Sequence, residues 1–118
     1  MRYTYGFEKL SVWQANRQFA KKLYKLTASF PKEELFGITS QIRRASISVS
    51  CNLAEGSARL GVKDQNRFYE IAFGSAIEVV NLLILCSDFG YVSEEDYDLL
   101  RSDMEKITYQ INQLRKDG

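Results

Sequence analysis

The chain has 118 residues, 45% of them hydrophobic and 13% aromatic, which suits one domain with its own core and excludes a disordered protein. Histidine is absent, which excludes the common zinc sites and every histidine-dependent catalytic arrangement. The formal net charge is only +1, but residues 1–60 carry ten Lys/Arg against four Asp/Glu and residues 61–118 carry six against eleven, so the two halves attract each other.

The first predicted helix covers residues 10–30. It begins with a capping box at Ser11, where the serine hydroxyl and the glutamine three residues later can satisfy two free N–H groups, and Pro31 prevents it from continuing. The apolar residues that recur at helical spacing are Val12, Ala15, Phe19, Leu23, Leu26 and Phe30. We expect Trp13 and Tyr24 to widen this buried face.

The second helix, predicted over residues 38–60, carries a polar stripe between two apolar rows. At 100° per residue, the polar stripe comprises Gln41, Arg44, Ser48, Asn52, Glu55 and Arg59. The first apolar row is Ile42, Ala45, Val49 and Leu53, and the second is Ile47, Cys51, Ala54 and Ala58. We expect both rows to be buried, so the stripe must pair within itself or with another chain. The alternative is a solvated stripe in which Glu55 and Arg59 form an ordinary i,i+4 pair.

The third predicted helix, residues 62–89, is apolar over about two thirds of its circumference in its second half. This exceeds what an antiparallel bundle needs on one helix, so we expect either a central position or a subunit interface. Glu78 lies on its narrow polar arc, and we group it with the polar stripe as a candidate oligomer contact.

The fourth predicted helix, residues 93–116, follows a helix break at Gly90. Ser93 supplies a cap, and the three acidic residues after it suit the helix dipole. The apolar row of this helix is Tyr97, Leu100, Met104, Ile107, Ile111 and Leu114. No segment alternates apolar and polar residues, so strands are not expected. The chain therefore predicts an all-α fold, one domain over residues 1–118, arranged as an up-down-up-down antiparallel four-helix bundle with the first helix beside the last.

Two glycines and two cysteines lie inside the predicted helices. A glycine in a helix costs about 1 kcal/mol relative to alanine, so we expect close helix approach at Gly56 and Gly74, with termination at Gly56 as the alternative. Cys51 and Cys86 lack the spacing of a metal or redox motif, and we expect both to be small buried hydrophobes.

Basic residues gather on and near the first helix. The candidate nucleic-acid contacts are Lys9, Arg17, Lys21, Lys22, Lys25 and Arg43. They can form a phosphate-contacting surface that repeats around an oligomer, or simply a solvated helix face. We expect Trp13, Phe19 and Tyr24 to be packed, which leaves this surface without the aromatic interleaving of single-strand binders.

Several motifs occur in order along the chain. They are Phe7-Glu8-x-Leu10-x-Val12-Trp13-Gln14, Phe30-Pro31, Gln41-Ile42-Arg43-Arg44-Ala45, Ser48, Asn52-Leu53-Ala54-Glu55-Gly56 and Ala72-x-Gly74-Ser75-x-x-Glu78. By these motifs the chain resembles the four-helix bundle family encoded in intervening sequences of bacterial 23S ribosomal RNA genes, which is related to the accessory protein of diversity-generating retroelements. The resemblance implies a left-handed bundle, a cytoplasmic homopentamer and no established enzymatic activity.

The chain departs from that family in two respects. Ser48-Val49-Ser50-Cys51 stands where many relatives have Ser-Ile-Pro-Ser, so we expect no proline kink in the second helix. The near-neutral net charge argues against a strongly basic accessory protein of the retroelement type.

These observations favour a protein that acts through interaction. We expect no catalytic residue, metal or cofactor, because serine chemistry would need a general base that the sequence does not show. Without a long apolar run or a signal-peptide segment, we expect a cytoplasmic protein that does not enter a membrane. The leading hypothesis is a non-enzymatic homopentameric scaffold, and the alternative is an accessory protein that binds structured RNA or DNA. The expected partner is a second copy of the chain, with nucleic acid or an unidentified protein as further candidates.

Overall fold

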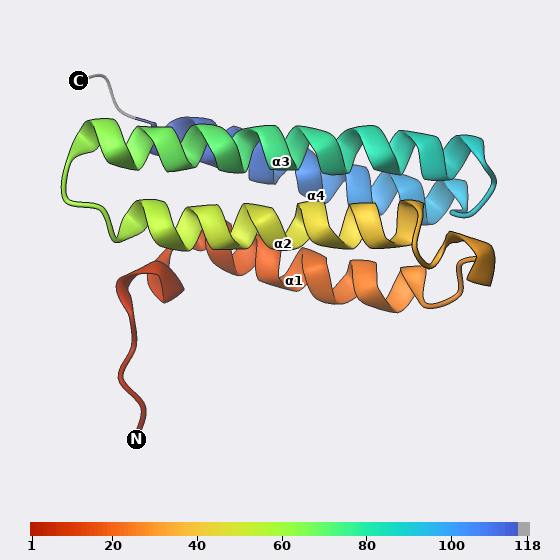
Figure 1. Cartoon of the computed structure of the whole chain (residues 1–118), viewed down its shortest axis with the longest axis horizontal. Helices are drawn as coiled ribbons and strands as arrows, with labels where there is room; N and C mark the ends of the chain where they lie inside the picture. Colours follow the sequence, from red (N-terminus) through yellow and green to blue (C-terminus); the bar gives the residue numbers. More distant parts are fainter. Residues whose placement is uncertain (116–118) are drawn as a thin grey trace.

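The computed structural model describes residues 1–115, which form helices and turns and contain no strand. The elements in order are η1 (Gly6–Lys9), α1 (Ser11–Thr27), η2 (Lys32–Glu34), α2 (Ile38–Ser57), α3 (Val62–Asp88) and α4 (Glu94–Leu114). Consecutive α-helices run in opposite directions, and each packs against two neighbours, since α1 also contacts α4 (Figure 1). The predicted all-α, up-down-up-down four-helix bundle is confirmed.

The helix ends differ from the predicted ones. Helix α1 ends at Thr27, three residues before the predicted end. The chain then turns so that Phe30 enters the core, and Pro31 disfavours helical backbone at Phe30. Helix α2 ends at Ser57, where the next two N–H groups bond three residues back and tighten the last turn. Helix α4 ends at Leu114, and the predicted end at residue 116 lies outside the described residues.

The predicted capping box at Ser11 is wrong, whereas the predicted cap at Ser93 is confirmed. Ser11 is already the first residue of α1, because η1 lies directly before it, and Gln14 donates its side-chain amide to the Glu8 carbonyl at 2.7 Å. The capping box belongs to η1, where the Glu8 carboxylate accepts the Tyr5 N–H at 2.7 Å. The Ser93 hydroxyl accepts the backbone N–H of Asp96 at 3.1 Å.

One apolar row from each helix forms the core. Its most deeply buried aliphatic and aromatic members are Phe19, Leu23, Ile42, Val49, Leu53, Val79, Leu83, Met104, Ile107 and Ile111. Each large side chain buried in this way contributes about 1.5–3 kcal/mol relative to exposure. The rows predicted from helical spacing therefore supply the core, although Ala15 and Leu26 at the edge of α1 are only partly buried.

Of the two predicted glycine contacts, one is confirmed and one is wrong, and the same holds for the predicted burial of the two cysteines. Gly56 is buried, and a Cβ atom there would lie 2.7 Å from the Tyr69 ring, which confirms close approach between α2 and α3. Gly74 faces open space, so the predicted close approach is wrong within this chain.

Cys86 is buried, as predicted, and burial together with the Glu34 carboxylate raises the pKa of its thiol to about 11. Cys51 is exposed, contrary to prediction, because it lies on the side of α2 that faces neither neighbouring helix.

Helix α3 carries the excess of apolar surface that its sequence predicts. Among residues 1–115 it is the one helix long and apolar enough to cross a membrane, with a mean hydropathy of 1.6, although a core helix of a soluble protein can reach the same value. About a third of that window, 33%, is buried in the bundle. The outward isoleucines Ile71, Ile77 and Ile84 are 46%, 47% and 38% exposed.

The two helical glycines provide a matched test of packing. Gly56→Ala should lower the free energy of unfolding by about 1–3 kcal/mol, because the new methyl group meets the buried Tyr69 ring. Gly74→Ala should instead raise it by up to about 1 kcal/mol, because the methyl group enters open space and alanine favours a helix. Urea unfolding monitored by circular dichroism measures both values. A Gly56→Ala protein as stable as the native chain would contradict the close approach.

Candidate functional site

The predicted polar stripe lies along the outer side of the seam between α2 and α3. Ser48 and Asn52 are half-buried, whereas the four charged or amide residues of the stripe toward its two ends are exposed: Gln41, Arg44, Glu55 and Arg59. The first apolar row is buried, but in the second row Ile47 is 45% exposed and Cys51 is also exposed. The prediction that both rows are buried is therefore wrong for the single chain, because the α-helices that pack against α2 are α1 and α3 and neither covers this side of it.

Hydrogen bonds satisfy the middle of the stripe within the chain. The Asn52 amide donates to the Ser48 carbonyl at 2.9 Å and to the Ser48 hydroxyl at 3.2 Å. The Ser48 hydroxyl also shares a hydrogen bond of 2.8 Å with the hydroxyl of Ser75 on α3. These residues therefore connect α2 to α3.

The charged members of the stripe remain unpaired within the described part of the chain. A depression of about 300 Å³ at the seam is lined by Gln41, Arg44, Ala45, Ser48 and Glu78. Among residues 1–115, neither Arg44, Glu55 nor Glu78 forms an ion pair. Arg59 does not pair with Glu55 but lies over the Phe68 ring, 4.6 Å from its centroid. Pairing of Glu55 with an arginine of a neighbouring subunit stays a prediction.

Exposed residues of both helices combine into one surface, which we call the α2–α3 face. Its members are Arg44, Ile47, Cys51 and Glu55 on α2 and Ile71, Gly74 and Glu78 on α3. Ile71 and Glu78 precede and follow Ser75 by about one helical turn, so they lie on the side of α3 nearest α2. The face therefore presents isoleucine side chains beside charges of both signs.

Two of the six predicted nucleic-acid contacts are engaged within the bundle. The Lys22 ammonium lies 3.0 Å from the Asp103 carboxylate of α4, an ion pair that joins the first helix to the last. Arg43 donates to the Thr27 hydroxyl at 2.8 Å and to the Tyr24 carbonyl at 3.3 Å. Arg43 thus ties the end of α1 to α2.

The other four basic residues are exposed, and two of them, Arg17 and Lys21, lie near aromatic rings. Arg17 lies over the Trp13 ring, 5.5 Å from its centroid, and Tyr24 is 39% exposed. A depression of about 390 Å³ is lined by Trp13, Arg17, Ala20, Lys21, Tyr24 and Ser50. The expectation that all three aromatic residues of α1 are packed is therefore wrong for Tyr24, whereas Phe19 is buried and Trp13, although partly exposed, packs against the core. Trp13 and Tyr24 lie at the edge of the contact between α1 and α2, beside Ser50, so neither helix covers the two rings completely.

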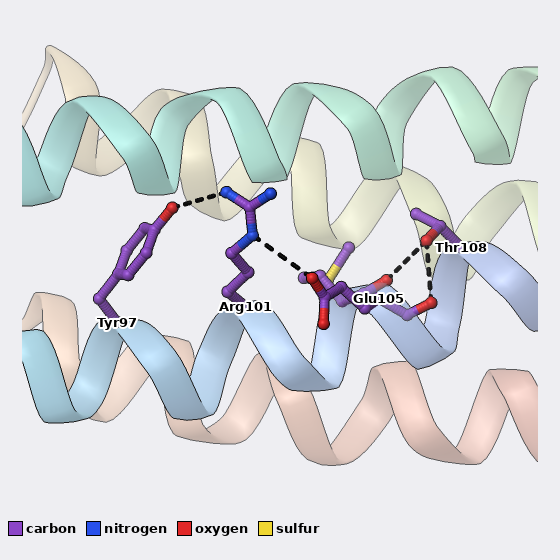
Figure 2. A network of polar contacts seen from close by, with 5 residues as sticks. Tyr97, Arg101, Glu105 and Thr108 are labelled. Carbon is purple, nitrogen blue, oxygen red and sulfur yellow. Dashed lines mark hydrogen bonds and ion pairs between the residues drawn. The ribbon is translucent and has the colours of Figure 1, made fainter.

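The acidic helix α4 satisfies part of its charge locally, on the side that faces α3 (Figure 2). Arg101 donates to the Tyr97 hydroxyl at 2.8 Å and lies 3.5 Å from the Glu105 carboxylate. The described residues contain no group of three or more His, Cys, Asp or Glu that could hold a metal ion.

Two structural contacts have no counterpart in the sequence-based predictions. Asn16 is fully buried on α1 and donates to the Ser50 hydroxyl at 2.7 Å and the Ser46 carbonyl at 3.1 Å, both on α2. Its position within the apolar row of α1 is the signal that could have revealed it. Tyr91 donates to the Glu34 carboxylate at 2.9 Å and connects the turn between α3 and α4 to η2, and this hydrogen bond raises the pKa of the Tyr91 hydroxyl.

Comparisons with known proteins agree with this architecture. A family model described as 23S rRNA-intervening sequence protein matches residues 8–113. A solved structure of a protein of unknown function from the S23 ribosomal protein family of Bacteroides thetaiotaomicron superimposes with a TM-score of 0.82 at 23% identity, over 90% of this chain and 96% of that chain. At that identity the likeness shows the fold alone. No curated protein matches the chain.

Adjacent arginines separate a structural role from a surface role. Arg43→Ala should lower the free energy of unfolding by about 1–2 kcal/mol, because it removes both hydrogen bonds that hold α1 against α2. At protein concentrations where the chain is monomeric, Arg44→Ala should change it by less than about 0.5 kcal/mol, because Arg44 is exposed and forms no ion pair among residues 1–115. Thermal or urea unfolding of the two variants checks the difference, and equal losses would refute the assigned contacts.

Proposed function

Since the chain belongs to the 23S rRNA-intervening sequence protein family, whose model covers residues 8–113, we propose that it is a non-enzymatic interaction protein that works as a homo-oligomer, with five copies as the assembly. The proposed contact is the α2–α3 face. Each copy would present this face to another copy, and the assembled particle would act as a scaffold.

The observation that supports self-association is a pair of exposed isoleucines, one from each helix of the face, beside an open glycine on α3. Ile71 precedes Gly74 by about one turn, Ile47 lies on α2, and nearly half of each isoleucine side chain is exposed. Gly74 costs the helix about 1 kcal/mol and receives no packing in return within the chain. Covering the isoleucines contributes about 25 cal/mol for each Å² of apolar surface removed from water, which gives a second copy a reason to bind there.

The charges of the α2–α3 face supply register to such a contact. Arg44 has no carboxylate partner among residues 1–115, and Glu55 and Glu78 have no cationic one. A neighbouring copy could place a carboxylate next to Arg44 and cationic side chains next to the two glutamates, which would pair all three charges. Buried or half-buried networks of this kind specify which arrangement forms more than they add stability.

A charge placed in the apolar part of the face should break the assembly. Ile71→Asp should convert the oligomer to a monomer, because the new carboxylate would have to lose water in the interface. Leu99→Asp is the matched control, since Leu99 is 67% exposed on α4 and lies outside the face. Light scattering coupled to size-exclusion chromatography measures the mass. A monomeric native chain, or an Ile71→Asp protein of unchanged mass, defeats the proposal.

Cys51 and Glu55 provide further readouts of the same contact. The exposed Cys51 thiol should react slowly with a thiol reagent in the oligomer and faster in Ile71→Asp, while the buried Cys86 thiol stays protonated and unreactive in both. Glu55→Gln should lower the stability of the oligomer, because it removes the charge proposed to pair across copies. An oligomer of unchanged mass and stability in Glu55→Gln argues against the network.

Nucleic-acid binding is a second candidate function, supported by the charge of the N-terminal quarter of the chain. Residues 1–30 carry six Lys/Arg and a single carboxylate, Glu8. Lys9, Arg17, Lys21 and Lys25 are exposed. Repetition of this basic surface around an oligomer raises its effective affinity for a polyanion without any new contact.

A salt-titrated binding assay tests the second function. The chain should retain structured RNA or duplex DNA at low salt, and the observed affinity should fall as salt rises. Arg17→Gln combined with Lys21→Gln should weaken retention, whereas Lys106→Gln, an exposed lysine of acidic α4, should not. Failure to retain either nucleic acid at low salt removes this function.

A further inference from the structure

We infer that the N-terminal arm and the adjoining side of α1 form a stacking site for single-stranded nucleic acid. We call this site the aromatic strip, and its rings are Tyr3, Tyr5, Phe7, Trp13 and Tyr24. The site rests on the nucleic-acid-binding function proposed above, to which it adds a ligand class and a location.

Four rings of the aromatic strip follow one another in contact. The centroid distances are 5.1 Å from Tyr3 to Tyr5, 6.2 Å from Tyr5 to Phe7 and 5.0 Å from Phe7 to Trp13. Tyr3 is 78% exposed and Tyr5 is 60% exposed. Figure 1 shows the reason, because the arm projects from the N-terminal end of α1 away from the four helices. Tyr3 and Tyr5 therefore gain little burial from the fold and remain available to a ligand, whereas Phe7 and Trp13 are partly buried and anchor the row to the bundle.

Hydrogen bonds position the base of the arm. The Glu8 carboxylate accepts the Tyr5 N–H, and the Glu8 carbonyl accepts the Gln14 side chain, each at 2.7 Å. These bonds fix the turn of η1 relative to the first turn of α1. The rings before and after this turn consequently stay in contact, with Tyr5 stacked on Phe7 and the other two contacts edge to face. A ligand that binds them therefore pays less ordering entropy than it would on a free tail.

The row continues from Trp13 into the depression that ends at Tyr24. Ala20 and Ser50 line this depression together with the two rings, and Arg17 and Lys21 complete it. Arg17 lies over Trp13, and Arg43 lies over Tyr24 at 4.5 Å from the ring centroid while its guanidinium bonds to the end of α1. The site thus combines aromatic rings for bases with Arg17 and Lys21 as cations for phosphates, the combination used by proteins that bind single strands.

The charge around the aromatic strip favours a polyanion over a protein segment of mixed charge. Glu8 is the sole carboxylate among residues 1–30, and it is already hydrogen-bonded to the Tyr5 N–H. The carboxylates of α4 meet α1 on another side, where Asp103 pairs with Lys22. A duplex offers its phosphates but keeps its base faces stacked inside, whereas a single strand offers both. The exposed rings therefore point to the single strand.

The only tryptophan of the chain makes the inference directly measurable. Trp13 fluorescence should be quenched when the native chain is titrated with a 12-nucleotide oligo(dT) or oligo(U) in low salt, because a base stacks beside its ring. Tyr3→Ala combined with Tyr5→Ala should reduce the affinity for the oligonucleotide by about 30-fold or more, at about 1–3 kcal/mol for each of the two lost stacking contacts. Arg17→Gln should reduce the salt dependence of binding by about one phosphate contact.

Matched controls keep the outcomes distinct. Tyr109→Ala removes an exposed tyrosine from α4, 64% exposed, and should leave the affinity unchanged. Circular dichroism and solution mass of each variant show that the fold and assembly are retained, which is expected because Tyr3 and Tyr5 lie outside the helices.

Four results would overturn the site. Retention of duplex DNA without binding of either oligonucleotide refutes the single-strand inference and leaves the proposed nucleic-acid function standing, whereas failure of both ligands removes both. Unchanged oligonucleotide affinity in the Tyr3 and Tyr5 double variant refutes the role of the arm. A fall in solution mass in that variant, with affinity retained, assigns the arm to contact with a second copy instead.

Discussion

Packing of the bundle core decides which side chains of each helix are buried and which remain exposed for interaction. Each helix packs against two neighbours, so it buries one row of side chains and leaves its opposite side uncovered. On α2 this geometry buries Val49 and Leu53 fully but leaves Ile47 nearly half exposed. On α3 it buries Val79 and exposes Ile71. Apolar side chains of α2 and α3 that the core does not cover are therefore exposed, and Ile47 and Ile71 among them belong to the α2–α3 face.

Polar contacts between helices set the alignment of those rows. Asn16 reaches from α1 to two groups on α2, Ser48 meets Ser75 between α2 and α3, and Lys22 pairs with Asp103 between α1 and α4. Such contacts use polar side chains that the sequence pattern alone would assign to ligand binding. Arg43 illustrates this, because its guanidinium bonds to the end of α1 and is not free for a phosphate.

The molecule consequently presents two chemically different surfaces. The α2–α3 face combines isoleucines with charges of both signs, which suits a second copy of the same chain. The aromatic strip combines exposed rings with positive charge, which suits a polyanion that carries its own rings. The two surfaces share no residue. The α2–α3 face lies on α2 and α3, whereas the aromatic strip lies on the N-terminal arm and α1, with Ser50 and Arg43 of α2 beside it. Assembly and ligand binding can therefore be separated by substitution.

The sequence by itself determined the helices and their buried rows. The reason is local: spacing near 3.6 residues places Val12, Phe19 and Leu23 on one side of a helix whatever packs against it. It also determined that the third helix has apolar surface to spare. Only the tertiary structure decided that Ile47, Cys51 and Gly74 face outward, that Tyr24 is accessible and that Asn16 is buried. Helical spacing gives the angle between two side chains, but the extent of burial on either side of a row depends on where the neighbouring helices end and how closely they approach, and those contacts join residues far apart in the chain.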